Sequence, residues 1–165
     1  MKIVCLVRHA KAGRDDSALR DFDRPLNARG EKQAPWIARG LKDSGVRPDV
    51  IISSPAKRAL ATAEILAKGI RYPREKVVTM RAIYGSGAPA ILKVIKNIGW
   101  DHDGAVVVGH NPSLSDLMNY LSRCEMRELP TAGIVCLRFD VASWKKIARG
   151  KGEVLFYGAP AKEKE

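Results

Sequence analysis

The chain has 165 residues, with 29 Lys and Arg against 18 Asp and Glu and a net charge of +11. A chain of this length is expected to form one domain, and its apolar content of 45% is that of an ordinary globular protein. No apolar stretch reaches the roughly 18–20 residues that a membrane span needs, and the first residues lack a secretory signal pattern. We therefore expect a cytoplasmic protein without a membrane partner.

The excess positive charge suggests an anionic partner, and nucleic acid is the first class to consider. Part of the excess is local, since residues 57–81 hold seven basic side chains against Glu64 and Glu75. The chain lacks the interleaved aromatic residues that stack bases, and no basic run is long enough to form an arm. The composition therefore favours a solvated basic face that attracts anionic substrates over a nucleic-acid-binding surface.

The first half of the chain alternates between predicted strands and helices. Residues 3–7 are apolar on both faces and rich in β-branched side chains, which indicates a short buried strand within residues 2–8. Asn27 is a favourable N-cap for a helix that extends to about Lys42, in which Pro35 should cause a kink or an interruption. The next predicted elements are a strand at residues 49–53, a helix with Pro55 in its first turn that extends to about Lys68, and a short strand at residues 77–80.

The second half continues this pattern and changes it near the end. Pro89 opens a predicted helix, residues 105–109 form a third buried strand, and residues 113–121 form a helix. Two late strands, at residues 133–140 and 153–157, have no full helix between them, which favours an antiparallel pair at one edge. The predicted fold is a three-layer α/β/α sandwich with a mixed, mainly parallel sheet, formed by residues 1–158. A charged tail at residues 159–165 is expected to be frayed.

Three of the predicted strands end in residues suited to binding an anion. Arg8 and His9 follow the first strand, Arg58 lies shortly after the second, and His110 and Asn111 follow the third long strand. Because the carboxyl ends of parallel strands meet at one edge of an open sheet, we expect these side chains to lie close together. Cations are costly to bury unless an anion meets them, so this edge predicts a phosphate-binding site.

The same segments resemble the histidine phosphatase superfamily, also called phosphoglycerate mutase-like. The resemblance rests on Arg8-His9, on residues 53–59 with Thr62, and on residues 108–112. The short length and two further stretches, residues 23–30 and 129–133, are similar to the SixA-like phosphohistidine phosphatases within this superfamily. The resemblance extends from Lys2 to about Tyr157. It implies a phosphoglycerate mutase-like fold and a metal-independent phosphatase without a cofactor.

The resemblance also implies a role for each matching residue. His9 would be the nucleophile and would form a phosphohistidine intermediate that water hydrolyses. Arg8 and Arg58 would bind the phosphoryl oxygens through their planar guanidinium groups, His110 would donate to an equatorial oxygen, and Asn111 would help to bind the substrate. Phosphoryl transfer mainly requires positioning and charge stabilisation, so this set suffices without a metal. The two arginines should keep His9 neutral and nucleophilic.

The chain departs from the family pattern in two places. Ala10 stands where the family usually has Gly, and residues 81–87 contain no Asp or Glu. Larger members place a carboxylate there as the general acid for a leaving alcohol. A phosphoramidate such as phosphohistidine has a weaker P–N bond and a leaving nitrogen that can already carry a proton, so the missing acid favours phosphohistidine over alkyl phosphate esters. The first loop offers four alternative acids, Asp15, Asp16, Asp21 and Asp23. Asp21 and Asp23, which lie beside Arg24, are better interpreted as ion-pair partners that fix the loop.

Several other residues suggest chemistry but fit simpler interpretations. The three cysteines lack metal-ligand spacing and are interpreted as small buried residues kept reduced in the cytoplasm. The Asp101-His102-Asp103 triplet is interpreted as a solvated loop and not as a metal site. Residues 85–90 match a dinucleotide fingerprint, but they do not follow the first strand of a βαβ unit and are predicted to form a helix-entry loop.

The sequence leaves three functions open. The favoured one is a phosphohistidine phosphatase whose partner is a phosphorylated protein. The first alternative is a phosphatase of a small phosphorylated metabolite, and the second is a non-catalytic binder of anionic ligands or nucleic acid. A phosphoglycerate mutase is disfavoured because the chain is short and the general acid is missing.

Overall fold

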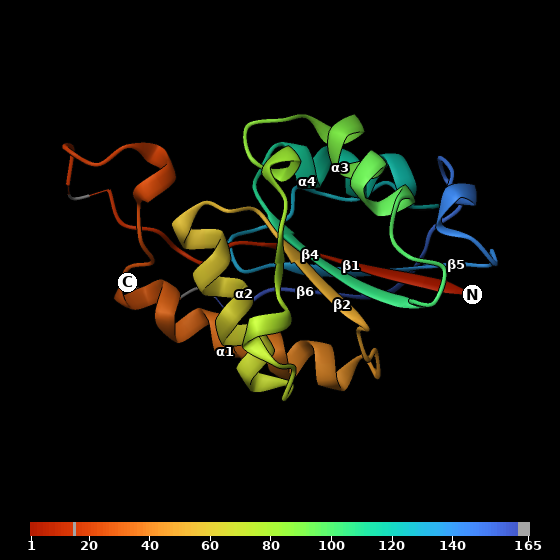
Figure 1. The fold of residues 1–165 in the computed structure, drawn as a ribbon, viewed down its shortest axis with the longest axis horizontal. Helices are drawn as coiled ribbons and strands as arrows, with labels where there is room; N and C mark the ends of the chain where they lie inside the picture. The colour runs from red at the N-terminus through yellow and green to blue at the C-terminus, as the bar shows by residue number, and fades with distance from the viewer. Residues whose placement is uncertain (15, 162–165) are drawn as a thin grey trace.

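The computed structural model describes residues 1–14 and 16–161 and contains a six-stranded sheet between two layers of helices (Figure 1). The strand order is β3-β2-β4-β1-β5-β6, in which β3, β2, β4 and β1 are parallel neighbours, β5 is antiparallel to β1, and β6 is antiparallel to β5. This mixed, mainly parallel sheet confirms the predicted fold class. The strands are β1 (Lys2–Arg8), β2 (Val50–Ser53), β3 (Val78–Thr79), β4 (Gly104–Gly109), β5 (Ile134–Phe139) and β6 (Glu153–Gly158).

Helices cover both faces of the sheet (Figure 1). The helices α1 and α2 pack together on one face, and α3 and α4 pack together on the other. The α-helices of the described residues are α1 (Ala28–Asp43), α2 (Lys57–Gly69), α3 (Ala88–Lys96) and α4 (Ser113–Leu121). Short 3₁₀ helices are η1 (Asp21–Asp23), η2 (Arg74–Lys76), η3 (Arg81–Ile83) and η4 (Trp144–Lys146).

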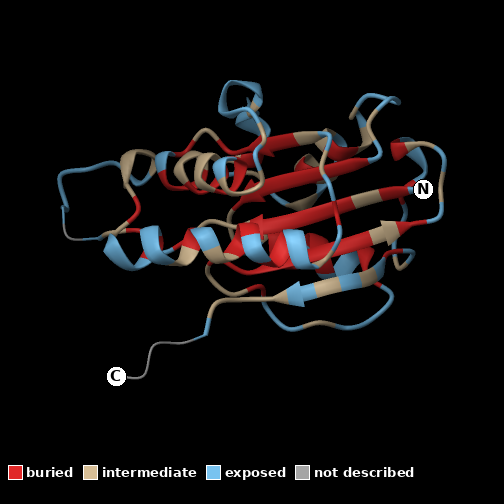
Figure 2. Ribbon diagram, turned by 90° about the horizontal axis from the view of Figure 1, so that it is seen from below, coloured by how far each residue is buried: buried red, intermediate tan, exposed pale blue. Residues whose placement is uncertain are grey.

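The alternation of side chains along β1 divides the core between the two faces. Cys5 and Val7 pack in the cluster formed with α1 and α2, whereas Val4 and Leu6 pack in the cluster formed with α3 and α4. All four side chains are fully buried. Figure 2 shows that the central strands are buried and that the edge strand β6 is partly exposed. The sheet is thus held from both sides, which fixes the strand ends where the site residues lie.

Two predictions about helices are wrong, namely that Pro35 interrupts its helix and that Pro55 lies in the first turn of the next one. The helix α1 continues from Ala28 to Asp43 through Pro35, and a kink there stays a prediction. Pro35 and Glu31 are both exposed, so water can bind the Glu31 carbonyl that the proline leaves without a helical donor. Pro55 lies before α2 and not in its first turn, because the Ser54 hydroxyl accepts the Ala56 N–H at 3.2 Å and holds the chain in a turn there.

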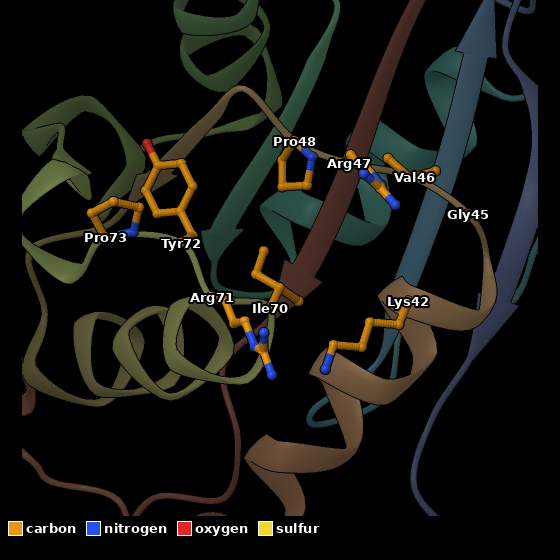
Figure 3. Close-up of a pocket in the computed structure, with 9 residues that line it drawn as sticks. All are labelled: Lys42, Gly45, Val46, Arg47, Pro48, Ile70, Arg71, Tyr72 and Pro73. Atoms are coloured by element: carbon orange, nitrogen blue, oxygen red, sulfur yellow. The ribbon is translucent and has the colours of Figure 1, made fainter.

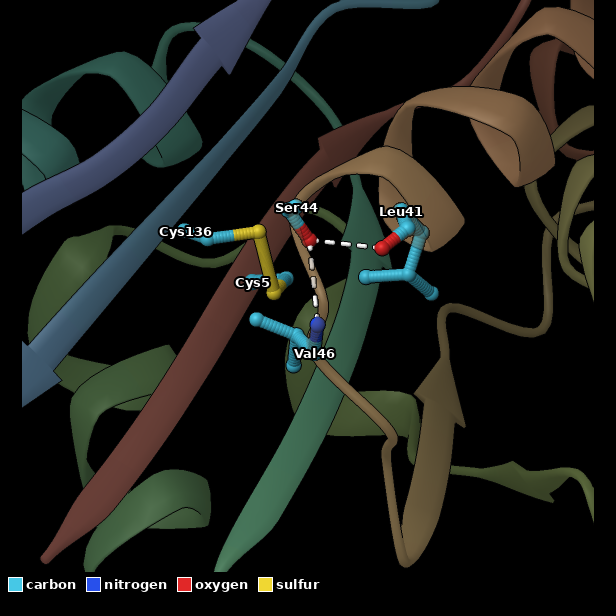
Figure 4. Close-up of a disulfide and its surroundings, with 5 residues drawn as sticks. All are labelled: Cys5, Leu41, Ser44, Val46 and Cys136. Carbon is cyan, nitrogen blue, oxygen red and sulfur yellow. Dashed lines mark hydrogen bonds between the residues drawn. A yellow bond between two sulfur atoms is a disulfide. The ribbon is translucent and has the colours of Figure 1, made fainter.

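The interpretation of the cysteines as separate reduced thiols is also wrong for two of them. Cys5 on β1 and Cys136 on β5 lie directly opposite each other and are joined in a disulfide (Figure 4). Both are buried, as predicted, but their pairing depends on an antiparallel neighbour 131 residues away. Cys124 is a free cysteine, and it is exposed, which contradicts its predicted burial.

Three further expectations concern a membrane-spanning helix, the C-terminal tail and the acids of the first loop. In the part that the structure describes, no helix combines the length and the apolar character that crossing a membrane requires. The predicted charged tail lies outside the described residues from position 162 onward, and Asp15, one of the candidate acids, lies outside them as well.

Candidate active site

The parallel strands β1, β2 and β4 end at the same edge of the sheet, and the predicted site residues follow them there. The His9 N–H donates to the Gly109 carbonyl at 3.1 Å, which ties the end of β1 to the end of β4. The Ser54 N–H donates to the Val108 carbonyl at 2.9 Å, which brings the segment after β2 to the same place. One cavity of about 340 Å³ is lined by all five predicted residues: Arg8, His9, Arg58, His110 and Asn111.

A second cavity of about 440 Å³ adjoins the first and shares Arg58, His110 and Asn111 with it. Its other wall comes from the loop between η3 and α3 and from the start of α4. The Ser113 hydroxyl donates to the Ser86 carbonyl at 2.6 Å and holds these two segments together. The two cavities together are called the catalytic cleft, after the catalytic roles predicted for the residues that line them.

His9 is arranged as a neutral nucleophile. Its Nδ1 lies 2.7 Å from the Ala10 carbonyl oxygen, and because a carbonyl accepts and does not donate, Nδ1 carries the proton. The other ring nitrogen, Nε2, therefore keeps its lone pair. The pKa of His9 is lowered to about 4, first by burial and then by the charges of Arg58, Arg8 and Arg24, against the opposing effect of the Ala10 hydrogen bond. At pH 7 the ring is neutral and Nε2 is nucleophilic.

Arg58 is the buried cation beside this nucleophile. It lies in the first turn of α2, and its Nε–H points to His9 Nε2 at 3.4 Å. Its two terminal nitrogens donate to Asp21, one to the backbone carbonyl at 2.6 Å and one to the carboxylate at 3.0 Å. The Thr62 hydroxyl accepts the Ala10 N–H and donates to the Arg58 carbonyl. The loop after β1 and the first turn of α2 are thus fixed to each other.

Among the described residues, two buried side-chain nitrogens have no hydrogen-bond partner, Arg8 Nε and His110 Nδ1. Ser54 Oγ accepts the Ala56 N–H and lies 2.8 Å from His110 Nε2. Among the described residues the Ser54 hydroxyl proton has no other acceptor, so we assign it to this contact and the ring proton to Nδ1. Burial, with the neighbouring His9 and Arg58, lowers the pKa of His110 to about 3, so the ring is neutral at pH 7. A buried donor without a partner costs free energy, and an anion bound here would relieve that cost.

Asp21 is the site residue whose contacts with Arg58 and Tyr84 the sequence did not reveal. Burial raises the pKa of its carboxyl, but hydrogen bonds from Tyr84, Arg58 and Arg24 outweigh burial and lower the pKa to about 2. Asp21 is therefore ionised at neutral pH and is not a proton donor. The interpretation of Asp21 as a residue that fixes the loop is confirmed, and Asp23 has the same function through Arg20 at 2.9 Å.

Asn111 lines both cavities, but its side chain is committed to the neighbouring loop. Its amide nitrogen donates to the Leu129 carbonyl at 2.8 Å and to the Glu128 carboxylate at 3.3 Å. The Leu129 carbonyl also accepts from Arg8 Nη1 at 3.1 Å. Asn111 thus positions the segment that holds Arg8, and its direct contact with a substrate stays a prediction.

A larger cleft of about 580 Å³ lies at the other end of the parallel strands (Figure 3). Its cations are Lys42, Arg47 and Arg71, and none of the predicted site residues lines it. The helices α1 and α2 end beside it, and cations are favourable near the negative end of a helix dipole. The positive charges of this cleft, which we call the helix-end cleft, are thus explained by the ends of α1 and α2.

The loop at residues 101–103 is held by contacts with Lys2. Asp103 pairs with Lys2 at 2.7 Å, and the His102 carbonyl accepts from the same ammonium group at 2.8 Å. In the described part of the chain, no three His, Cys, Asp or Glu side chains gather in an arrangement that could hold a metal ion.

The comparison with known sequences identifies the family. The profile of the histidine phosphatase superfamily (branch 1) matches residues 4–85. An uncharacterized protein of Picosynechococcus is 30% identical over 138 residues, which cover 82% of this chain and 84% of that protein. The chain belongs to the histidine phosphatase superfamily. It is a phosphatase of this superfamily, and one cavity is lined by the residues with predicted catalytic roles: His9, Arg8, Arg58 and His110.

Two solved structures resemble this histidine phosphatase over nearly its whole length. SixA of Agrobacterium tumefaciens is 26% identical, with a TM-score of 0.80, and the match covers 97% of this chain and 99% of that one. SixA of Nakamurella is also 26% identical, with a TM-score of 0.83, and the match covers 98% and 97%. Both proteins are assigned as phosphohistidine phosphatases. The likeness confirms the phosphoglycerate mutase-like architecture that the sequence predicts.

Proposed function

We propose that the protein hydrolyses phosphohistidine in a phosphorylated protein, through a covalent phosphohistidine intermediate on His9 and without a metal ion. The observation that carries this proposal is the pairing of a neutral His9, whose Nε2 carries no proton, with buried donors on Arg8 and His110 that have no partner among the described residues. A phosphoryl group placed between them would meet a nucleophile on one side and hydrogen-bond donors around its oxygens.

In the first step, the lone pair of His9 Nε2 attacks phosphorus and the P–N bond of the substrate breaks. A phosphoimidazole that is protonated on its other ring nitrogen leaves as neutral imidazole, so no acid has to supply a proton. His9 becomes cationic when Nε2 binds phosphorus, and the Ala10 carbonyl stabilises the proton on Nδ1. In the second step, water attacks phosphorus, the bond to Nε2 breaks, and inorganic phosphate leaves with the protons of that water.

The absence of a suitable acid supports a phosphoramidate substrate. Among the described residues that line the two cavities, Asp21 is the one carboxylic acid, and its pKa of about 2 keeps it ionised. Tyr84 donates its hydroxyl to that carboxylate at 2.9 Å, and its pKa is raised, first by burial and then by this hydrogen bond. An alkyl phosphate needs a proton for its leaving oxygen, whereas a protonated phosphoimidazole does not.

The test compares a phosphohistidine peptide with p-nitrophenyl phosphate, with EDTA present, in the parent protein and in His9→Ala. We expect phosphate release from the peptide by the parent, no release by His9→Ala, and an acid-labile phosphoenzyme in the parent alone. Circular dichroism of both proteins shows whether the variant is folded.

Three results would contradict the proposal in different ways. Turnover that persists in His9→Ala would exclude the covalent route. Turnover of the ester alone would favour a small phosphorylated metabolite as substrate. No turnover by a folded parent on either compound would favour a non-catalytic anion binder.

A further inference from the structure

We infer that the catalytic cleft selects substrates that carry a second anionic group next to the phosphoryl group, and that Lys11 and Arg14 recognise this group. The inference rests on the proposed function, because it concerns the leaving-group side of the same cleft. It names a substrate class, namely a phosphorylated group with a carboxylate or phosphate close by, as in a phosphohistidine flanked by acidic side chains.

The cavity around His9 contains more cations than a phosphoryl group requires. Five cationic side chains line it, whereas Asp21 is the one carboxylate among the described residues that do so. Three of the five have assigned partners or roles. The family resemblance assigns Arg8 and Arg58 to the phosphoryl oxygens. Arg24 donates to the Asp21 carboxylate at 3.1 Å and to the Gly13 carbonyl at 3.3 Å.

Lys11 and Arg14 are the cations that remain. Both are exposed, and within residues 1–14 and 16–161 neither side chain forms an ion pair or a hydrogen bond. Their charges are therefore not neutralised by an acidic partner that the structure describes. They lie on the loop after β1, shortly after the nucleophile in the chain, and both line the His9 cavity.

The backbone that carries these two cations is fixed. The Lys11 N–H donates to the Gln33 side chain at 3.2 Å, and the Lys11 carbonyl accepts from the Asn27 N–H at 3.0 Å. Just before Arg14, the Gly13 N–H donates to the Pro25 carbonyl at 3.0 Å. A side chain that is free on a fixed backbone can bind a ligand group without ordering the loop first.

The opposite wall of the cleft carries no such excess of charge. The described residues that the 440 Å³ cavity adds are uncharged, and they are Ile83, Tyr84, residues 85–87, Pro112 and Ser113. The extra positive charge is thus confined to the side of Lys11 and Arg14. A cleft lined by one sign of charge concentrates ligands of the opposite sign. Here Lys11 and Arg14 supply positive charge in addition to the residues assigned to the phosphoryl oxygens.

The test uses two phosphohistidine peptides that differ only in whether the flanking residues are Glu or Gln. We expect the parent to prefer the Glu peptide by about tenfold in kcat/KM at low salt. The double variant Lys11→Gln, Arg14→Gln should turn over both peptides at equal rates. The matched control Lys42→Gln, Arg47→Gln removes the same charge from the helix-end cleft of Figure 3 and should keep the preference.

Equal rates for the two peptides in the parent would overturn the inference and leave the proposed function standing. A preference that persists in the double variant would overturn the assignment to Lys11 and Arg14. Calorimetry of phosphoglycolate and ethyl phosphate binding measures the same selectivity without turnover. This measurement is informative even if the protein has no phosphatase activity. Preferential binding of phosphoglycolate that the double variant loses supports the inference for a small molecule, and equal binding of the two compounds confines it to acidic peptides.

Discussion

The two clefts at opposite ends of the parallel strands are both lined by cationic side chains, but they differ in what surrounds those side chains. The helix-end cleft is larger, about 580 Å³ against 340 Å³ and 440 Å³ for the two cavities of the catalytic cleft. Its cations lie where α1 and α2 end, so helix dipoles account for them. The catalytic cleft holds a neutral histidine and buried donors without a partner among the described residues. Cleft volume and positive charge thus do not single out the catalytic cleft, whereas a neutral histidine beside unsatisfied donors does.

After His9→Ala, the largest expected effect is that of Arg58→Lys. Lysine has one ammonium group and cannot point to His9 while it holds both the carbonyl and the carboxylate of Asp21. We expect kcat/KM for a phosphohistidine peptide to fall by about 10³-fold. The matched substitution Arg47→Lys in the helix-end cleft should leave kcat/KM unchanged. Equal losses of kcat/KM in both variants would contradict the assignment of activity to the catalytic cleft alone.

The next effect is that of His110→Ala, which removes the Nδ1 donor assigned to the phosphoryl oxygen. We expect kcat/KM to fall by about 10²-fold, since a preorganised donor in such a site contributes about this much. The phosphoenzyme on His9 should still form, more slowly, and rapid-quench measurement of its formation checks this. A variant with normal kinetics would show that His110 does not contact the transition state.

The pH dependence of kcat/KM follows from the lowered pKa of His9. Protonation of Nε2 removes the lone pair, so activity is present above the folded-state pKa of about 4 and is lost as the pH falls through it. Below that midpoint we expect a loss of about tenfold per pH unit. An acid midpoint near the ordinary histidine value of 6.5 would show that burial and the arginines do not act on His9 as the structure indicates.

The same pKa shifts make the folded protein less stable in acid. His9 and His110 have pKa values near 4 and 3 when folded, against 6.5 for an unperturbed histidine, so the unfolded chain binds more protons. The free energy of unfolding should therefore fall as the pH drops below about 6.5 and level off for these two groups near their folded values. Urea unfolding across this range, in the parent and in His9→Ala, measures the contribution of His9.

A smaller effect is expected from Tyr84→Phe. This variant removes the hydroxyl that donates to Asp21 at 2.9 Å and so loosens the carboxylate that holds Arg58. We expect kcat/KM to fall about fivefold, which corresponds to about 1 kcal/mol for one hydrogen bond. Tyr72→Phe removes a hydroxyl from the helix-end cleft and should have no effect on turnover. Identical kinetics for Tyr84→Phe and the parent would mean that Asp21 needs no support from Tyr84.

The smallest effect is expected from Arg71→Gly in the helix-end cleft. Arg71 has a φ of 60° after the last turn of α2, a left-handed conformation that glycine adopts with less strain. We expect the free energy of unfolding to rise by about 0.5–1 kcal/mol, with kcat/KM unchanged. Arg71→Ala keeps the strained conformation without the charge and should not gain this stability. A loss of turnover in Arg71→Gly would show that the two clefts are coupled.

Most of the site could be predicted because its residues follow local patterns. Arg8-His9 and His110 each come directly after an apolar run, and Arg58 lies in the first turn after another. The antiparallel pair β5 and β6 was also predictable, since no full helix separates these strands. The helix through Pro35 was not, because the tolerance of a proline depends on whether the freed carbonyl faces water.

The sequence by itself determined the family, the order of strands and helices, and which residues reach the carboxyl edge of the sheet. Those features depend on residue types and spacing along one stretch of chain. The tertiary structure alone decided that Asp21 holds Arg58 and Tyr84, that Cys5 meets Cys136, and that Lys11 and Arg14 form one wall of the cleft. It also decided how far the pKa of His9 is lowered. These features depend on burial and on contacts between distant segments, which no local pattern encodes.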